Sequence, residues 1–331
     1  MVDEVLGLDI GGANLKAATT SGVASSRPFA LWKHPERLVG EMQGLLHALP
    51  PFARLAVTMT GELCDCYETK RQGVNAILNA VESAAGSSPI LVWQTPGNFS
   101  DVATARLRTL QVAAANWLAL ATFAGRFARE GGAILIDVGS TTSDIIPMWQ
   151  GRPTARNFTD TERLLSGELV YTGVRRTPVC ALLGSDGMAE FFATMQDVNL
   201  TLGRMPENEN DNDTADGRPA TRRYALARLA RMMGGDIEIT PEPVIVRLAE
   251  MVADRQHEIL RKAALNVASR LPDVPSTVIL SGSGEFLATW VASSAFGNGA
   301  RYVSLSRQIG AEVSQASCAY AVAVLAKEMN S

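Results

Sequence analysis

Two aspartates, Asp9 and Asp137, each stand at the end of a short apolar segment and are followed by glycine and small polar residues. Residues 9–16 read Asp-Ile-Gly-Gly-Ala-Asn-Leu-Lys, and residues 137–144 read Asp-Val-Gly-Ser-Thr-Thr-Ser-Asp. Glycines allow backbone N–H groups to approach phosphate oxygens, and carboxylates hold Mg²⁺ through its water molecules. The two runs therefore predict a pair of loops that bind a magnesium-bound polyphosphate.

The residue types within these runs suggest individual roles. We expect the Mg²⁺ ion to be positioned by three carboxylates, those of Asp9, Asp137 and Asp144. The phosphates are expected to contact the ammonium group of Lys16 and the loop residues Gly11, Gly12, Asn14, Gly139, Ser140, Thr141 and Thr142. Asp and Gly are also common in ordinary turns, so either run alone is compatible with a structural hairpin. The presence of two matching runs favours a binding site.

Each loop must lie at the tip of a β-hairpin, because apolar segments flank it on both sides. Residues 5–18 form the first hairpin pattern and residues 133–146 form the second. The two patterns lie about one domain length apart in the chain. We interpret them as an internal duplication, with an N-terminal phosphate-loop domain at residues 1–130 and a C-terminal one at residues 131–331.

Strand-like and helix-like patterns alternate between and after the hairpins, which predicts an α/β fold. Further strands are expected at residues 54–61, 90–93 and 278–280. Helices are expected at residues 72–85, 111–127, 244–271 and 310–329. We expect the last helix to pack back onto the N-terminal domain.

The polar segment 207–221 is rich in Asn and Asp and is expected to be an inserted surface loop or a lid. If it is a lid, Asp213, Asp216 and Arg218 face the cleft. Four arginines follow this segment and are expected to form the solvated face of an amphipathic helix, namely Arg222, Arg223, Arg228 and Arg231.

The amino-acid composition argues against several classes of protein. The chain has 331 residues, of which 47% are hydrophobic, and a formal net charge of −4. These values argue against a disordered protein and provide no basic footprint for nucleic acid. No apolar run approaches the ~18 residues of a membrane span, the first residues lack a signal-peptide pattern, and four cysteines make no disulfide scaffold. We expect a cytoplasmic protein that binds a small molecule, and the choice between monomer and homodimer stays open.

Three small-residue turns together resemble those of the acetate kinase, sugar kinase, Hsp70 and actin superfamily. Residues 9–16 and 137–144 resemble its two phosphate loops, and Ser281–Glu285 is placed like its adenosine-binding turn. The resemblance implies two related α/β domains, actin-like and ribonuclease H-like, around a central cleft. It also implies that ATP or another nucleotide, or else the organic part of the substrate, contacts Gly282, Ser283, Gly284 and Glu285.

A narrower resemblance lies outside these turns. Residues 58–74, 167–178 and 213–221 resemble the hydantoinase/oxoprolinase-like branch, and within it the tetrahydromethanopterin-linked C1-transfer pathway proteins of methylotrophs and methanogens. Archaeal members of that group act as furanylmethanamine synthases in methanofuran biosynthesis. The resemblance implies a transferase that joins an aminomethylfuran-methyl diphosphate to the phenol of a tyramine- or tyrosine-type acceptor and releases diphosphate.

This chemistry implies roles for residues that follow the strand at 54–61. The base that removes the phenol proton is expected to be Glu62 or Asp65. Lys70 and Arg71 are expected to bind the diphosphate or an acceptor carboxylate, unless they are the solvated start of a helix. The same loops suit ATP equally well, so an ATP-dependent kinase or a hydantoinase/oxoprolinase-type hydrolase is the alternative function.

Overall fold

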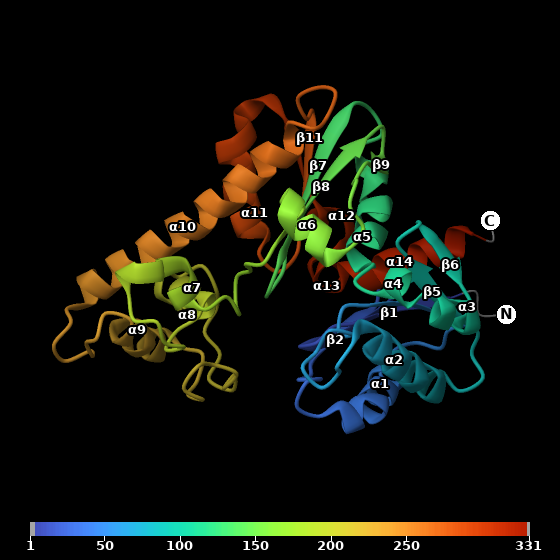
Figure 1. Cartoon of the computed structure of the whole chain (residues 1–331), viewed down its shortest axis with the longest axis horizontal. Helices are drawn as coiled ribbons and strands as arrows, with labels where there is room; N and C mark the ends of the chain where they lie inside the picture. The colour runs from blue at the N-terminus through green and yellow to red at the C-terminus, as the bar shows by residue number, and fades with distance from the viewer. Residues whose placement is uncertain (1–3, 330–331) are drawn as a thin grey trace.

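The structure is a computed structural model that describes residues 4–329. It contains two mixed β-sheets with helices packed around them (Figure 1). The first three residues, where part of the signal-peptide expectation falls, lie outside the described part of the chain. Within residues 4–329, no helix is both long enough and apolar enough to cross a membrane. The four cysteines are free thiols.

The first sheet has the strand order β3-β2-β1-β4-β5-β6. Its strands are β1 (Val5–Ile10), β2 (Asn14–Thr19), β3 (Ala24–Pro28), β4 (Arg54–Met59), β5 (Ile90–Gln94) and β6 (Asn98–Ser100). β1 and β2 form the predicted antiparallel hairpin, and β4 pairs with β1 in parallel. One face of this sheet packs its hydrophobic side chains against α1 (Leu38–His47) and α2 (Lys70–Ala85).

The second sheet has the order β10-β8-β7-β11-β12, with β9 also paired to β8. Its strands are β7 (Gly132–Val138), β8 (Ser143–Trp149), β9 (Arg152–Pro153), β10 (Leu169–Val170), β11 (Thr277–Ser281) and β12 (Arg301–Ser304). β7 and β8 form an antiparallel hairpin, and β11 pairs with β7 in parallel. The same core arrangement therefore occurs in both sheets, which confirms the prediction of two related α/β units.

Strand register aligns the two hairpins residue by residue. Asp9 pairs with Lys16 across the first hairpin, and Asp137 pairs with Asp144 across the second. The position opposite the aspartate thus carries a cation in one hairpin and a second carboxylate in the other. The internal symmetry of the backbone is not repeated in charge.

The helix expected at residues 111–127 is interrupted. α3 (Val102–Leu107) and α4 (Thr109–Val112) come first, and α5 (Asn116–Ala124) begins only after a bend at Ala114. Ala114 has a φ of 48°, a left-handed conformation that costs an alanine about 1 kcal/mol. The alanine-rich composition favoured one continuous helix, and tertiary contacts around the bend override that preference.

The C-terminal half supplies most of the helices. They are α6 (Asp160–Ser166), α7 (Val179–Leu183), α8 (Met195–Thr201), α9 (Arg222–Arg231), α10 (Glu242–Ala268), α11 (Glu285–Phe296), α12 (Leu305–Ile309), α13 (Ala311–Gln315) and α14 (Ser317–Glu328). α10 is unbroken over 27 residues, and α7, α8 and α9 lie along its N-terminal part, away from the second sheet (Figure 1). The single helix expected at 310–329 is divided into α13 and α14.

The segment 207–221 is a loop between α8 and α9, and a buried arginine holds it. The Nε atom of Arg228 lies 2.7 Å from Oδ1 of Asp197, and its Nη1 lies 2.9 Å from Oδ1 of Asp216. Arg228 is fully buried, so its expected place on a solvated face is wrong. A buried guanidinium needs carboxylate partners, and the two aspartates supply them. Asp216 therefore faces α9 instead of an open cleft.

The C-terminal helix α14 returns to the first sheet and lies across β1 (Figure 1). A Cβ atom placed on Gly7 of β1 would overlap the carbonyl oxygen of Ala319 in α14. Small residues on both sides permit this approach, because Ala319 and Ala323 of α14 are also fully buried. The absence of a side chain at Gly7 thus allows the two ends of the chain to pack together.

Replacing Gly7 by alanine is expected to lower the free energy of unfolding by about 3 kcal/mol, because the added methyl group must displace α14 from β1. Gly40 in α1 is the matched control, since a Cβ atom there meets nothing within 4 Å. Gly40→Ala is expected to be neutral or to stabilise the protein by up to about 1 kcal/mol through helix propensity. Denaturant unfolding measures both variants, and equal stabilities would contradict the close packing at Gly7.

Candidate functional site

The tips of the two hairpins meet at one small cavity of about 160 Å³. Asp9 and Lys16 line it from the first sheet, and Asp137 and Asp144 line it from the second. The other loop residues that line it are Gly11, Gly12, Asn14, Gly139, Ser140, Thr141 and Thr142. The structure thus brings together every residue that the sequence assigned to the two phosphate loops.

The two loops have the same backbone closure. The Gly11 N–H donates to the carbonyl of Asn14 at 3.0 Å, and the Gly139 N–H donates to the carbonyl of Thr142 at 2.9 Å. Such tight turns direct successive N–H groups toward a common centre, where they suit an anion.

Burial changes the ionisation of both loop aspartates. Desolvation raises the pKa of Asp9 to about 6, against an opposing effect of Lys16. Desolvation and then the carboxylate of Asp144 raise the pKa of Asp137 to about 6. The Oδ1 atom of each aspartate is buried and has no hydrogen-bond partner among the described residues. A divalent cation would stabilise both ionised carboxylates, so the residues present fit Mg²⁺.

The carboxylates do not form a complete metal cage. Among residues 4–329, no group of three or more His, Cys, Asp or Glu side chains is arranged to hold a metal ion. Mg²⁺ usually keeps several waters and shares one or two carboxylates with substrate phosphates. Asp9 and Asp137 would hold the ion in that way, with phosphate oxygens completing its coordination.

Asp144, the third expected metal carboxylate, already has a cationic partner. Its Oδ1 atom lies 2.7 Å from Nη2 of Arg163, which also donates to the carbonyl of Glu168 at 3.1 Å. The Arg163 guanidinium is buried and stacks on the ring of Trp117, with its Cζ atom 4.0 Å from the ring centroid. Desolvation raises the pKa of Asp144 although Arg163 opposes the shift. Asp144 therefore anchors Arg163 beside the site.

Two helices begin at the small cavity, and no pattern in the sequence predicts this. Asn116 at the start of α5 and Ser317 at the start of α14 both line it. The first N–H groups of a helix lack intrahelical acceptors and carry partial positive charge, so the start of α14 favours a phosphate. At α5 the Trp117 N–H already donates to Oδ1 of Asn116 at 2.8 Å, and the Leu118 N–H donates to the carbonyl of Ala115 at 3.2 Å. Ser314, Gln315 and Cys318 also line the cavity. These residues lie at the opposite end of the chain from the first loop, and no local pattern connects them.

Only the first half of the third turn reaches the small cavity. Gly282 and Ser283 line it, and a Cβ atom on Gly282, whose φ is 91°, would overlap the carbonyl oxygen of Val138. Gly284 lies beneath the second loop, where its N–H donates to the Val138 carbonyl at 2.8 Å. The Glu285 carboxylate accepts a hydrogen bond from Ser306 Oγ at 3.1 Å. Neither Gly284 nor Glu285 lines this cavity.

A larger cavity of about 450 Å³ adjoins the small one between the two halves of the molecule. The two cavities share lining residues, namely Gly12, Ala13, Thr60, Asn116, Thr141, Thr142 and Asp144. The rest of the larger wall is more aromatic and carries further ionisable groups, namely Trp32, Glu62, Leu63, Cys64, Asp65, Ala114, Trp117, Asp160, Arg163, Leu169, Tyr171 and Arg176. A molecule with a phosphate end and an organic end can therefore occupy both cavities at once.

Glu62 is 1% exposed and lines the larger cavity. Desolvation raises its pKa to about 7, although the ammonium group of Lys70 and the backbone of Ala114 act in the opposite direction. Its Oε2 atom is buried and has no hydrogen-bond partner among the described residues. A carboxyl group with a pKa near neutrality, beside a space for substrate, is suited to general-base catalysis. Asp65, the other expected base, is exposed at the same cavity.

Lys70 and Arg71 line neither cavity. The Nζ atom of Lys70 lies 2.8 Å from Oδ2 of Asp160, and this ion pair connects α2 of the first half with α6 of the second. Arg71 is exposed. The structure thus gives Lys70 a partner across the cleft and leaves both residues outside the phosphate cavity.

Residues 54–327 match the family model described as hydantoinase/oxoprolinase. A curated relative from Methanocaldococcus jannaschii is 31% identical over 332 residues, which cover 97% of each chain. Its name describes it as a synthase. The product in that name is a (furan-2-yl)methanamine with a phenoxymethyl group, and the phenyl ring of that group bears a 2-(gamma-L-glutamylamino)ethyl chain. A relative of the same name from Methanococcus vannielii is 31% identical over 214 residues, covering 61% of this chain and 94% of its own.

Among solved structures, the nucleotide-free acetone carboxylase has a similar fold, with a TM-score of 0.55 and 12% identity over 96% of this chain and 70% of its own. At that identity, the similarity concerns the fold alone. The family match covers the second phosphate-loop hairpin and begins after the first one, and the Methanocaldococcus relative aligns along nearly the whole length. This chain therefore belongs to the hydantoinase/oxoprolinase family.

Proposed function

We propose that this protein joins an aminomethylfuran-methyl diphosphate to the phenol oxygen of a tyramine- or tyrosine-type acceptor and releases diphosphate, as a step in the synthesis of a methanofuran-type C1 carrier. One observation supports this most directly. A small cavity lined by two phosphate-type loops adjoins a larger cavity that is lined by a buried carboxylate, Glu62, whose Oε2 atom has no hydrogen-bond partner within residues 4–329. The product named for the relatives contains the matching aryl ether, a phenoxymethyl group on a furan.

The small cavity is the place for the diphosphate. Lys16, the N–H groups of the two loops and the start of α14 would neutralise the charge that develops on the departing oxygens. Asp9 and Asp137 would hold Mg²⁺ against the same oxygens. When bound, the ion supplies further positive charge to the leaving group.

The larger cavity is the place for the furan and the phenol. The bond between the furan methylene and the diphosphate oxygen breaks, and a bond forms between the methylene and the phenol oxygen. The phenol proton passes to the Glu62 carboxylate, and the electron pair of the broken bond leaves with the diphosphate. Glu62 is suited to this transfer because its pKa of about 7 lies between those of ordinary carboxylic acids and of a phenol.

Cys64 also lines the larger cavity and lies close to the first loop, since a Cβ atom on Gly12 would lie 2.7 Å from its Sγ. Desolvation raises the pKa of the Cys64 thiol to about 11. Only the thiolate is a strong nucleophile. The protonated thiol is therefore a poor competitor of the phenol for the activated furan.

The test is to incubate the purified protein with Mg²⁺, an aminomethylfuran-methyl diphosphate and tyramine, and to measure released diphosphate and the aryl ether by mass spectrometry. Coupled formation of both products, dependent on the phenol, is expected. A parallel reaction receives ATP in place of the furan diphosphate. ADP formation without ether would overturn the proposal in favour of the ATP-dependent kinase or hydrolase that the same fold supports.

A further inference from the structure

Two arginines line the larger cavity, and they differ in whether a carboxylate is paired with them. Arg163 is paired with Asp144 and is buried. Arg176 is half-buried, and no carboxylate among the described residues lies within ion-pair distance of it. Of the carboxylates in the wall, Asp160 is paired with Lys70, while Glu62 and Asp65 have no cationic partner among the described residues. Arg176 is thus a charge in the cavity that no carboxylate contacts directly.

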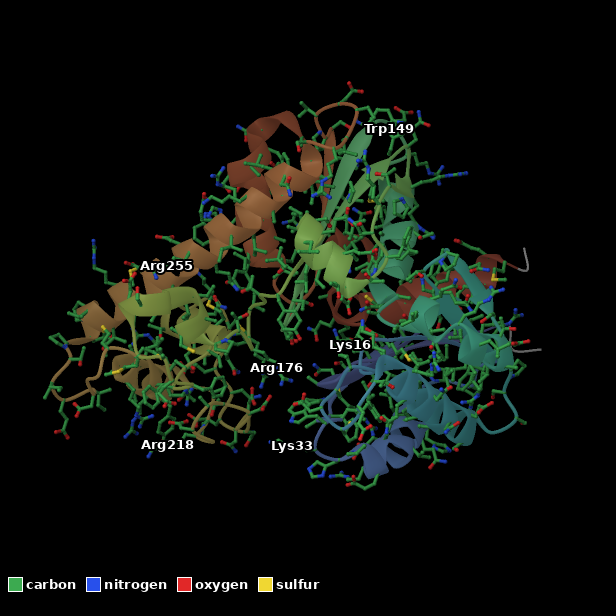
Figure 2. The ribbon with its side chains drawn as sticks, in the orientation of Figure 1. Lys16, Lys33, Trp149, Arg176, Arg218 and Arg255 are labelled. Carbon is green, nitrogen blue, oxygen red and sulfur yellow. The ribbon has the colours of Figure 1, made fainter. Side chains whose placement is uncertain are left out.

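Arg176 is nevertheless held in place. Its Cζ atom lies 4.6 Å from the centroid of the Trp32 ring, so the guanidinium stacks on an aromatic side chain of the opposite half. Its backbone N–H donates to the carbonyl of Ser140 in the second phosphate loop at 2.9 Å. Figure 2 shows Arg176 between the two halves of the molecule. A cation that is oriented but unpaired is prepared for an anionic group of a ligand.

The position of Arg176 defines which part of a ligand it meets. Arg176 and Trp32 line the larger cavity and not the small one. The phenol oxygen must approach the furan methylene, which is bonded to the diphosphate in the small cavity. A group that contacts Arg176 therefore belongs to the end of the acceptor remote from the reacting oxygen.

We propose that Arg176, stacked on Trp32, binds the carboxylate of the phenolic acceptor and so selects acceptors of the amino-acid class; this assignment rests on the proposed function. The planar guanidinium can donate two parallel hydrogen bonds to a carboxylate, and the Trp32 ring lies against the guanidinium, with the ring centroid 4.6 Å from Cζ. That carboxylate has two sources: the α-carboxylate of tyrosine, or the more distant one of a γ-glutamyl group on tyramine. The product named for the relatives carries the second.

The experiment compares kcat/KM for three acceptors, namely tyramine, tyrosine and γ-glutamyltyramine, with the same furan diphosphate. In the native protein, kcat/KM is expected to be higher for one of the two carboxylate-bearing acceptors than for tyramine. The acceptor with the higher value identifies the source of the carboxylate that Arg176 binds. Arg176→Met is expected to reduce the preference by about 30-fold, the size of a charge-assisted hydrogen-bond pair. Arg176→Lys keeps the positive charge but loses the paired N–H donors of the guanidinium. This variant is expected to retain only part of the acceptor preference.

Lys33 provides the matched control, because it is exposed and its Nζ atom lies 6.0 Å from the centroid of the same Trp32 ring. Lys33→Met is expected to leave the acceptor preference unchanged. An equal loss of preference in Lys33→Met and Arg176→Met would indicate general electrostatic attraction and overturn the assignment, as would an unchanged preference in Arg176→Met. Failure of the proposed function gives a different result, because then no acceptor, tyramine included, yields diphosphate and ether. In that case the assignment of Arg176 is overturned as well.

Discussion

Replacing Asp9 or Asp137 by asparagine is expected to lower the kcat for diphosphate release by about a thousandfold. Each aspartate faces the small cavity with a buried oxygen that has no partner in the described part of the chain. The amide has the same shape but lacks the negative charge that would hold a cation beside the phosphates. Release of diphosphate at saturating substrate, measured over a range of Mg²⁺ concentrations, checks the effect.

The same substitutions are expected to raise the thermal stability of the free protein. The folded-state pKa of Asp9 and Asp137 is about 6, above the ordinary value of 3.8. Folding therefore takes up protons between these values, and the stability of the native protein falls as the pH rises through that window. Asparagine carries no such cost, so the Tm of each variant is expected to exceed that of the native protein above pH 6 and to converge with it toward pH 3.8.

Asp273→Asn is the matched control, because Asp273 is exposed and lines neither cavity. It is expected to alter neither the rate nor the Tm. Unchanged rates in both cavity variants would remove Asp9 and Asp137 from the mechanism. A loss of rate accompanied by a lower Tm would instead indicate that the two carboxylates support the fold.

Replacing Glu62 by glutamine is expected to lower kcat/KM for ether formation by about a hundredfold or more, because glutamine cannot accept the phenol proton. In the native protein, kcat/KM is expected to rise with pH through about 7, as the Glu62 carboxyl group ionises. The variant is expected to lack that rise. Rates of ether formation across this pH range, compared between the two proteins, provide the measurement.

Glu68→Gln is a suitable control for this experiment, since Glu68 is exposed and lies outside both cavities. It is expected to keep both the rate and the pH dependence of the native protein. A Glu62→Gln variant that retains the rise near pH 7 would show that another group is the base. Asp65, which is exposed at the same cavity, would then be the next candidate for the base and the next residue to mutate.

The two hairpins and the loops at their tips could be predicted from the amino-acid sequence alone. Alternating apolar residues, a terminal aspartate and the following glycines are all local features, and a tight turn between two strands depends on little else. The same holds for α2, which ends at Gly86 as its spacing predicts, and for the strand at 277–281 with the turn after it. The repetition of the hairpin was sufficient to predict two related α/β units.

How these parts form a site depends on contacts that exist only in the folded protein. The break at Ala114 puts the start of α5 at the phosphate cavity, against the helix propensity of an alanine-rich run. The pairing of Arg163 with Asp144, and of Lys70 with Asp160, depends on which carboxylate is within reach after folding. The sequence around a charged residue does not reveal its ion-pair partner or its burial, because both depend on residues that are distant along the chain. For the same reason the contribution of α13 and α14 to the cavity, and the unpaired Arg176 above Trp32, emerged only when both halves were in place.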